Sequence, residues 1–228
     1  MRKIVILTGA GMSAESGLGT FRDVGGLWDR YDLEDVATPQ GYARNPDLVH
    51  GFYNSRRANC LDAHPNAAHR ALAALEDRWA GDLILVTQNI DDLHERAGHR
   101  RVHHMHGELL QALCAACGHR WPAPREMSTE TLCPACSAAA ARPDVVWFGE
   151  MPYGMDEILR HLWEADLFVS IGTSGTVYPA AGFVAEAAEH GAATLELNLE
   201  PAETSAHFDE IRQGPATRLV PDWVASLI

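Results

Sequence analysis

The sequence has little positive charge for its size. It holds 18 lysine and arginine residues against 31 aspartate and glutamate residues, a formal net charge of −13. Proteins that bind the phosphate backbone of DNA or RNA carry a basic surface. We therefore expect no nucleic-acid partner, although this charge does not exclude basic protein segments as substrates.

Long apolar runs are also missing. No segment approaches the ~18–20 apolar residues of a membrane-spanning helix, and the run at 4–7 is too short for the core of a secretory signal. We therefore expect a cytoplasmic protein with no membrane attachment. A hydrophobic content of 46% is typical of globular proteins, and 228 residues can form one core with a small added module.

Cysteine is scarce outside one short segment. Cys114 and Cys117 form one Cys-x-x-Cys pair, and Cys133 and Cys136 form a second, with fifteen residues between the two pairs. This spacing is typical of a four-thiolate zinc site, which leaves no open position and is therefore structural. A redox dithiol is the alternative, but clustered cysteines in the cytoplasm more often bind metal. We expect Cys60, the fifth cysteine, to be a buried apolar residue without a functional role.

Short runs rich in Val, Ile and Leu alternate with helical patterns. The runs lie at 4–7, 83–86, 145–148, 167–171 and 194–197, and helices are predicted at 46–61, 65–79 and 179–190. This alternation predicts an α/β fold with a parallel sheet covered on both faces. Gly9, Gln88, Gly172 and Asn198 follow four of the runs, so we expect them to surround one crevice. Residues 111–142 lack this periodicity and predict an inserted zinc-binding module.

Glycine-rich sequence follows the first run, in the pattern Gly9-x-Gly11-x-x-Ala14. Such a turn between a strand and a helix can hold a phosphate on backbone N–H groups, although the pattern alone is a weak signal. No strand precedes the acidic residues expected about 20 positions later, so an ordinary Rossmann dehydrogenase fits poorly.

Polar groups follow the second run, as Gln88-Asn89-Ile90-Asp91, and an imidazole comes later at His106-Gly107. Together with the glycine turn they suggest chemistry on a bound nucleotide. In an extended segment His104 and His106 share a face and His103 points away. The residues alone do not decide between His104 and His106 as the base, although Gly107 would let a substrate approach His106.

The chain resembles the sirtuins, NAD-dependent protein-lysine deacylases, and is most similar to the short bacterial members of the desuccinylase class. The matching segments are 9–17, Thr20-Phe21-Arg22-Asp23, 87–91, His106-Gly107, Phe148-Gly149-Glu150, Gly172-Thr173-Ser174 and Asn198-Leu199-Glu200, with the four cysteines in their usual place. The resemblance implies one catalytic domain over 1–228. Its Rossmann-like NAD-binding part would carry small-domain insertions at about 20–60, helical, and 111–142, zinc-binding.

The resemblance also implies roles for individual residues. His106 would be the general base, with Asn89 and Asp91 beside it at the catalytic centre. The cofactor-binding residues would be Gly9, Ala10, Gly11, Glu15, Phe21, Arg22, Gln88, Asn89, Ile90, Asp91, Gly172, Thr173, Ser174, Asn198, Glu200 and Ala216. The reaction would give free lysine, nicotinamide and O-acyl-ADP-ribose.

Tyr53 and Arg56 lie three residues apart on the predicted helix at 46–61, so they share a face. A guanidinium binds a carboxylate through paired hydrogen bonds, and the tyrosine hydroxyl adds a donor. A solvated arginine beside a core tyrosine is the alternative from the residues alone. The resemblance favours a pocket for succinyl and malonyl groups, with space at Ala37, that still accepts acetyl-lysine.

The protein substrate is expected to bind as an added strand between residues 147–150 and 175–178, contacting Phe148, Gly149 and Val177. We expect a monomer. Three other functions stay open: a protein ADP-ribosyltransferase with the same NAD site, a non-enzymatic NAD-binding module, and a dehydrogenase. The Tyr53–Arg56 pair argues against the first, the polar groups around His106 against the second, and the cysteine module against the third.

Overall fold

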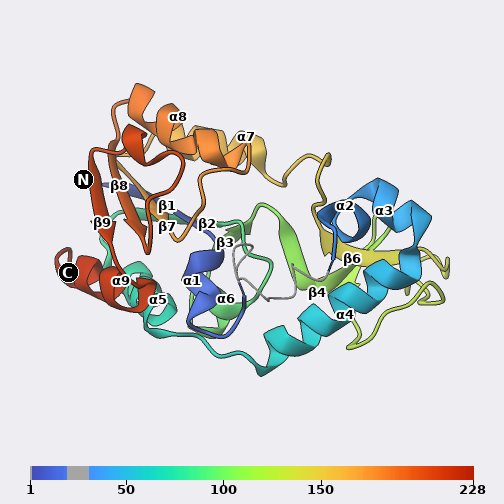
Figure 1. Cartoon of the computed structure of the whole chain (residues 1–228). Helices are drawn as coiled ribbons and strands as arrows, with labels where there is room; N and C mark the ends of the chain where they lie inside the picture. The colour runs from blue at the N-terminus through green and yellow to red at the C-terminus, as the bar shows by residue number, and fades with distance from the viewer. Residues whose placement is uncertain (1, 20–30) are drawn as a thin grey trace.

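Six parallel strands form the larger of two lobes in the computed structural model, which describes residues 2–19 and 31–228 (Figure 1). Their order across the sheet is β3-β2-β1-β7-β8-β9. The strands are β1 (Lys3–Thr8), β2 (Asp82–Thr87), β3 (Val102–His104), β7 (Leu167–Ile171), β8 (Ala193–Asn198) and β9 (Glu210–Gln213). Four of the five predicted runs lie in these strands, and the predicted α/β class is confirmed.

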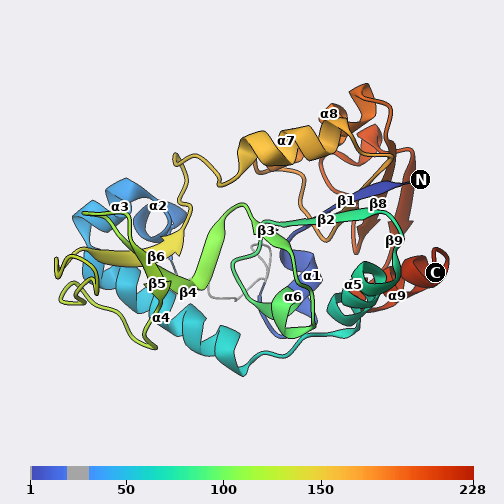
Figure 2. The same ribbon diagram turned by 180° about the vertical axis from the view of Figure 1, so that it is seen from behind.

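Both faces of this sheet are covered, which explains why its inner strands are continuous apolar runs. In β1, Ile4 and Ile6 face α5 (Ala67–Arg78) and α9 (Ala216–Ala225), where Leu72 and Trp223 pack against them. The alternate side chains of β1 contact α7 (Met155–Trp163) and α8 (Phe183–Glu189) on the opposite face. Figures 1 and 2 show the two helix pairs on opposite sides of the sheet.

The predicted helices are present with small shifts at their ends. Asn45 caps α4 (Pro46–Asp62) by accepting a hydrogen bond from the Leu48 amide. Asn66 caps α5, which therefore begins two residues after the predicted position 65. The segment predicted at 179–190 begins as a 3-10 turn, Ala180–Gly182, before α8. None of the helices among the described residues has the length and apolar character needed to cross a membrane.

The start of β1 is anchored by two acidic residues from the segment before β7. The amides of Arg2 and Lys3 donate to Asp166 Oδ2 at 2.6 and 2.9 Å. Lys3 is buried, and its Nζ lies 2.5 Å from Glu164 Oε2. These contacts hold the N-terminal end of the central strand in register with its neighbour.

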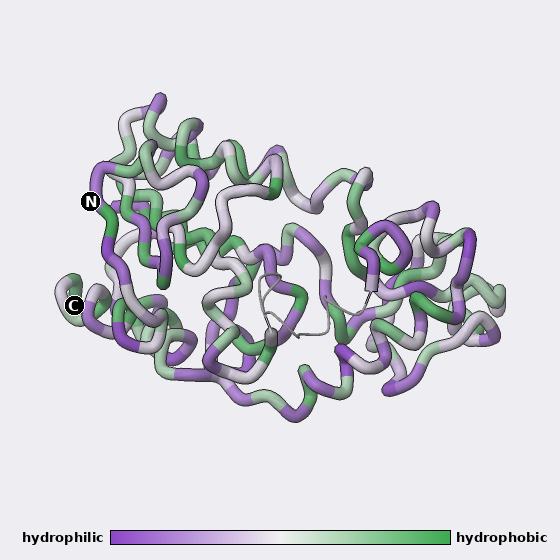
Figure 3. The backbone as a smooth tube through the Cα atoms, in the orientation of Figure 1, coloured by the Kyte–Doolittle hydropathy of each residue, from purple (hydrophilic) through white to green (hydrophobic). Residues whose placement is uncertain are grey.

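The smaller lobe combines helices with a separate antiparallel sheet. The helices are α2 (Leu33–Val36), α3 (Pro39–Arg44) and α4, and the strands are β4 (Gly107–Cys114), β5 (Arg120–Pro122) and β6 (Ala141–Val145). The strand order is β5-β4-β6, and both pairings are antiparallel. In Figure 3, hydrophobic segments occur in both lobes, consistent with buried clusters on each side.

The prediction of a parallel strand at 145–148 is wrong. Only Val145 belongs to a strand, and this strand pairs antiparallel with β4 in the small lobe. Val145 and Trp147 are apolar because they pack into the core of the small lobe, whereas Phe148 is 47% exposed. A short apolar run does not distinguish a strand of a large sheet from a chain segment that packs with alternate side chains.

Arg57 links the parts of the small lobe. Its side chain is buried, with Nε donating to the carbonyl of Leu109 in β4 at 3.1 Å and Nη1 donating to Asn54 Oδ1 at 2.8 Å. The Asn54 Oδ1 in turn accepts from the Met127 amide, within the cysteine-containing segment. The residue next to the candidate acyl-binding arginine therefore has a structural task.

Candidate active site

A cavity of about 920 Å³ opens at the carboxyl ends of the parallel strands and extends to the small lobe. Gly9, Gln88, Gly172 and Asn198 all line it, as the order of the strands predicts. Its volume is at the upper end of the range for small-molecule sites, about 300–1,000 Å³. It can therefore hold a ligand of dinucleotide size together with part of a second substrate.

Close backbone packing builds the cavity wall after β1 and β7. The amides of Gly9 and Gly11 donate to the carbonyls of Ile171 and Gly172, both at 2.9 Å. A Cβ atom at Gly11 would lie 2.8 Å from the Cα of Gly172, and Gly172 itself has a φ of +62°. Glycine is therefore required for these two turns to meet. Ala10 and Gly11 both line the cavity beside this junction.

A buried polar cluster fixes the residues after β2. The side-chain Nδ2 of Asn89 donates to the Gly9 carbonyl at 3.0 Å and to Ser13 Oγ at 3.1 Å. Ser13 Oγ donates in turn to Asp91 Oδ2 at 3.0 Å, while Asp91 Oδ1 accepts from the Leu93 amide, at the start of α6 (Leu93–Arg96). Burial raises the pKa of Asp91 above its usual range, although these two hydrogen bonds oppose the shift.

Ser13 is absent from the residues singled out from the sequence. It lies inside the glycine-rich segment, and only the folded chain shows that its hydroxyl joins Asn89 to Asp91. Its Oγ also lies 3.4 Å from Nε2 of the buried His69. The one signal in the sequence that could have identified Ser13 is a hydroxyl within a Gly-rich turn.

The two candidate histidines have different environments. His106 lines the cavity, and its Nδ1 donates to the Gln88 carbonyl at 3.1 Å, which leaves Nε2 as an acceptor. Burial lowers the pKa of His106 despite this hydrogen bond. A neutral imidazole that lines the cavity and keeps one nitrogen as an acceptor is suited to act as a base.

His104 instead forms an ion pair. Its Nε2 lies 2.7 Å from Glu95 Oε1. Burial by itself lowers the pKa of His104, but the hydrogen bond and the charge of Glu95 outweigh it, so the pKa lies above the ordinary value. The Nε2 atom of His104 is therefore engaged by Glu95, and His104 does not line the cavity.

The end of the cavity near β8 is formed by residues predicted to bind the cofactor. Asn198 Nδ2 donates to the Thr173 carbonyl at 2.7 Å. Glu15 accepts from the amide and hydroxyl of Thr217, at 3.0 and 2.7 Å, and so ties α1 (Ala10–Ala14) to the start of α9. The cavity lining at this end includes Glu15, Thr173, Ser174, Asn198, Glu200 and Ala216.

The opposite end reaches the small lobe. Ala37, Tyr53 and Arg56 line it, and Tyr53 is buried, its hydroxyl accepting a hydrogen bond from Trp147 Nε1 at 3.0 Å. Burial raises the pKa of Tyr53, so the hydroxyl keeps its proton and can donate it. Ile90, Phe148, Gly149 and Val177 also line the cavity. Phe21 and Arg22, assigned to cofactor binding from the sequence, lie outside the described residues.

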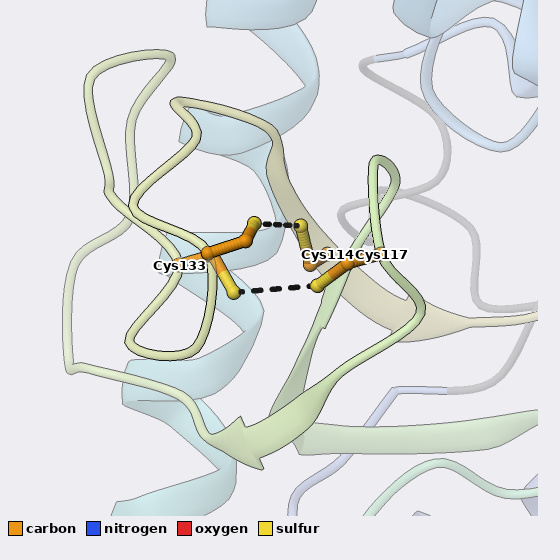
Figure 4. Close-up of side chains that lie close together, drawn as sticks. Cys114, Cys117 and Cys133 are labelled. Carbon is orange, nitrogen blue, oxygen red and sulfur yellow. Dashed lines mark hydrogen bonds between the residues drawn. The ribbon is translucent and has the colours of Figure 1, made fainter.

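The four cysteines of the small lobe come together at its outer end. Cys114 and Cys117 lie on one turn and face Cys133 on the other (Figure 4). The Sγ atoms of Cys114 and Cys136 are 3.7 Å apart, and those of Cys117 and Cys133 are 3.8 Å apart. Zn–S bonds of about 2.3 Å in a tetrahedron place sulfur atoms about 3.8 Å apart. The set therefore fits one structural zinc ion and is too widely spaced for disulfides.

One crevice therefore brings together the glycine turns at Gly9 and Gly172, the buried polar cluster around Asn89 and the His106 imidazole. These features are typical of a dinucleotide-dependent α/β enzyme, here with an inserted metal-binding module. Residues 9–179 match the Sir2 family. An NAD-dependent protein deacylase of Caulobacter vibrioides is 60% identical over 230 residues, covering 99% of this chain and 97% of the relative. The NAD-dependent protein deacylase of Escherichia coli (strain K12) is 53% identical over 229 residues, covering 99% and 82%.

Solved structures agree. A Sir2 homologue in complex with NAD superposes with a TM-score of 0.90 at 38% identity, covering 99% of this chain and 89% of that chain. Sir2 bound to an acetylated peptide superposes with a TM-score of 0.84 at 26% identity, covering 99% and 93%. The chain belongs to the Sir2 family, and the resemblance to sirtuins drawn from its sequence is confirmed.

Proposed function

We propose that this protein removes acyl groups from lysine side chains of other proteins and consumes NAD⁺, releasing nicotinamide and O-acyl-ADP-ribose. The observation that carries the proposal is the position of His106. Its imidazole lines a cavity that has Gly9 and Gly11 at one end and the Tyr53–Arg56 pair at the other, and its Nδ1 is engaged by the Gln88 carbonyl. The relatives named above, at 53% and 60% identity, support the same reaction class.

When bound, NAD⁺ would supply a ribose carbon that exchanges nicotinamide for the acyl oxygen of the substrate, and a ribose hydroxyl that attacks the acyl carbon, after which water releases the free lysine. His106 Nε2 takes the proton of that hydroxyl, while the Gln88 carbonyl keeps Nδ1 protonated and fixes the ring orientation. Asn89 and Asp91, joined through Ser13, hold the cavity wall beside His106 in one conformation. The cofactor would lie along the cavity from Ala216 to Gln88.

We further propose that the enzyme accepts acyl groups that end in a carboxylate. Arg56 is the only arginine or lysine among the described residues that line the cavity. Tyr53 adds a hydroxyl donor, and the small Ala37 leaves room for a longer acyl chain. Acetyl-lysine, which has no distal charge, remains a substrate because nothing in this pairing requires one.

The substrate protein would add a strand between residues 147–150 and 175–178. Phe148 and Tyr178, one from each segment, line the cavity and are 47% and 76% exposed. Main-chain pairing of this kind is tolerant of sequence. We also propose a monomer in the cytoplasm, which size-exclusion chromatography and cell fractionation would test.

The experiment follows free nicotinamide and peptide mass with NAD⁺ and matched acetyl-lysine and succinyl-lysine peptides. Native protein should remove the acyl group from both peptides and so lower their mass. Arg56→Met removes hydrogen bonds to a charged group, each worth about 1.5–3 kcal/mol. It should therefore lower kcat/KM for the succinyl peptide ~10- to 150-fold and leave the acetyl peptide much less affected.

His106→Asn is the control for chemistry and should lower both activities by about 10²–10⁴-fold, the usual contribution of a general base. Equal losses for the two peptides in Arg56→Met would overturn the acyl preference alone. Consumption of NAD⁺ with ADP-ribose appearing on the peptide or the protein, and no acyl group removed, would move the function to ADP-ribosyl transfer.

A further inference from the structure

Three side chains that the deacylase chemistry does not use come together on the far side of β3. They are His103 on β3 and Glu157 and His161 on α7. His103 Nδ1 lies 3.9 Å from Glu157 Oε2, and His161 Nε2 lies 3.6 Å from Glu157 Oε1. One ligand atom from each residue falls within 4.8 Å of the others.

The backbone brings these residues together on rigid elements. Met105, which follows β3, packs with Ile158 and Leu162 of α7 in one buried cluster. His103 also faces α7, where its ring lies 5.9 Å from that of His161, whereas His106 lines the catalytic cavity. Glu157 and His161 are four residues apart on α7 and so lie on one face of the helix. Both Figure 1 and Figure 2 show α7 lying over this part of the sheet.

The spacing of the three groups suits an ion better than direct contact. Both distances exceed the length of a hydrogen bond between side chains, 2.7–3.2 Å. Zn²⁺ bonds of about 2.0–2.2 Å to nitrogen and oxygen place neighbouring ligand atoms roughly 3.0–3.5 Å apart. Small side-chain rotations are therefore enough to close the three groups around a metal. The side chains of His161, His103 and Glu157 are 11%, 27% and 51% exposed, so an ion can enter from solvent.

Of the two positive charges near this cluster, one is paired elsewhere and the other makes only a long contact with Glu157. Lys3 Nζ is paired with Glu164 at 2.5 Å. Arg160 Nη2 lies 3.9 Å from Glu157 Oε1 and is an exposed side chain that can turn into solvent. A cation can therefore replace the long Arg160 contact with little loss of interaction energy.

We propose that His103, Glu157 and His161 bind one divalent transition-metal ion, preferentially Zn²⁺, at a site separate from the four cysteines. Two imidazoles and one carboxylate suit Zn²⁺, Co²⁺ or Ni²⁺ and not the harder Ca²⁺ or Mg²⁺, which prefer oxygen ligands. Water completes the coordination on the exposed side. The ion cross-links β3 to α7. Met105 and His106 follow two and three residues after His103 in the chain.

The test measures metal, so it is independent of acyl specificity. Protein that holds its structural zinc is titrated with Zn²⁺ by calorimetry, and metal content is measured after equilibration with excess Zn²⁺ and gel filtration. Native protein should bind a second zinc per chain. His103→Gln and His161→Gln should each weaken this second event at least about tenfold, because loss of even an outer hydrogen-bond partner weakens metal binding ~10–100-fold. His207→Gln, which removes an exposed histidine on the 3-10 turn Ser205–His207, is the matched control and should bind like native protein.

Co²⁺ identifies the ligands. Cobalt at the proposed site should give weak visible bands without the intense sulfur-to-metal charge-transfer absorption of a thiolate site, and these bands should disappear in His161→Gln. Addition of Zn²⁺ should also raise the Tm of native protein and not of the two variants. A single zinc per chain in native protein, or a second zinc retained in both variants, overturns the proposal. Neither result bears on the deacylase function, which the peptide assay tests separately.

Discussion

The two lobes reach stability by different means. In the large lobe, β1 and its neighbours are buried between helices on both faces, and Ile4, Leu85 and Val169 are fully buried. At the outer end of the small lobe, the buried apolar cluster consists of Ala112, Met127 and Ala141. Because this apolar cluster is small, this end of the lobe is stabilised instead by its four cysteines and by the Arg57 hydrogen bonds. The outer end of the small lobe therefore depends on its cysteines, whereas the small-lobe wall of the cavity, at Ala37, Tyr53 and Trp147, belongs to a buried apolar cluster.

The strongest way to separate the lobes is Cys114→Ser. Apparent binding free energies of structural zinc in small domains are about 10–16 kcal/mol, so loss of one thiolate should remove most of the stability of the metal-binding end. We expect loss of zinc and fast hydrogen exchange at 107–145, with the strands of the large lobe still protected. Full stability after loss of the metal would contradict this division of the molecule.

Leu85→Ala tests the stability of the large lobe. Leu85 is fully buried in the middle of β2, and truncating a buried leucine lowers the free energy of unfolding by about 2–5 kcal/mol. Denaturant unfolding should show this loss while zinc content stays at the native level. If zinc were lost along with the sheet under native conditions, the lobes would have to be treated as one cooperative unit.

Arg57→Met tests the hydrogen bonds within the small lobe. The substitution leaves the Leu109 carbonyl without its partner from Arg57, and an unsatisfied buried acceptor lowers the free energy of unfolding by about 1–3 kcal/mol. The expected result is a lower Tm with an unchanged ratio of succinyl to acetyl activity. Arg56→Met, one residue earlier, is the matched variant and should change the ratio. A changed ratio in Arg57→Met would show that the two arginines do not have separate tasks.

The smallest effect concerns pH. His106 is active as the neutral imidazole, and burial places its pKa below the ordinary 6.5. Activity on an acetyl peptide should therefore rise with pH through a midpoint below 6.5 and remain high at neutral pH. The profile of kcat/KM against pH measures this midpoint, and His104→Gln should leave it in place, since His104 pairs with Glu95. A midpoint above 6.5 would indicate that a neighbouring carboxylate, not burial, dominates the environment of His106.

The sequence predicted most of the large lobe because buried parallel strands are read directly as runs such as 4–7 and 167–171. It failed at 145–148, where an apolar run packs into the small lobe without forming a strand of the parallel sheet. The strand ends predicted one crevice, and Gly9 and Gly172 do meet there. Periodicity identifies what is buried, but not against which partner.

The roles of individual side chains were harder to predict from the sequence. It left His104 and His106 as alternatives, and only the contacts with Glu95 and the Gln88 carbonyl distinguish them. Arg57 is buried, although nothing in the sequence distinguishes it from an exposed basic residue. Such roles depend on partners that are distant in the chain, and residue spacing contains no information about those partners.

Lys3 has a consequence for any laboratory that studies this protein. It is the only lysine in the sequence, and it is buried at the start of β1 against Glu164. Antibodies against modified lysine, amine-reactive dyes and lysine-specific proteases therefore find a single side-chain target in the whole chain. A reaction mixture analysed by these reagents reports on the added proteins with very little background from the catalyst.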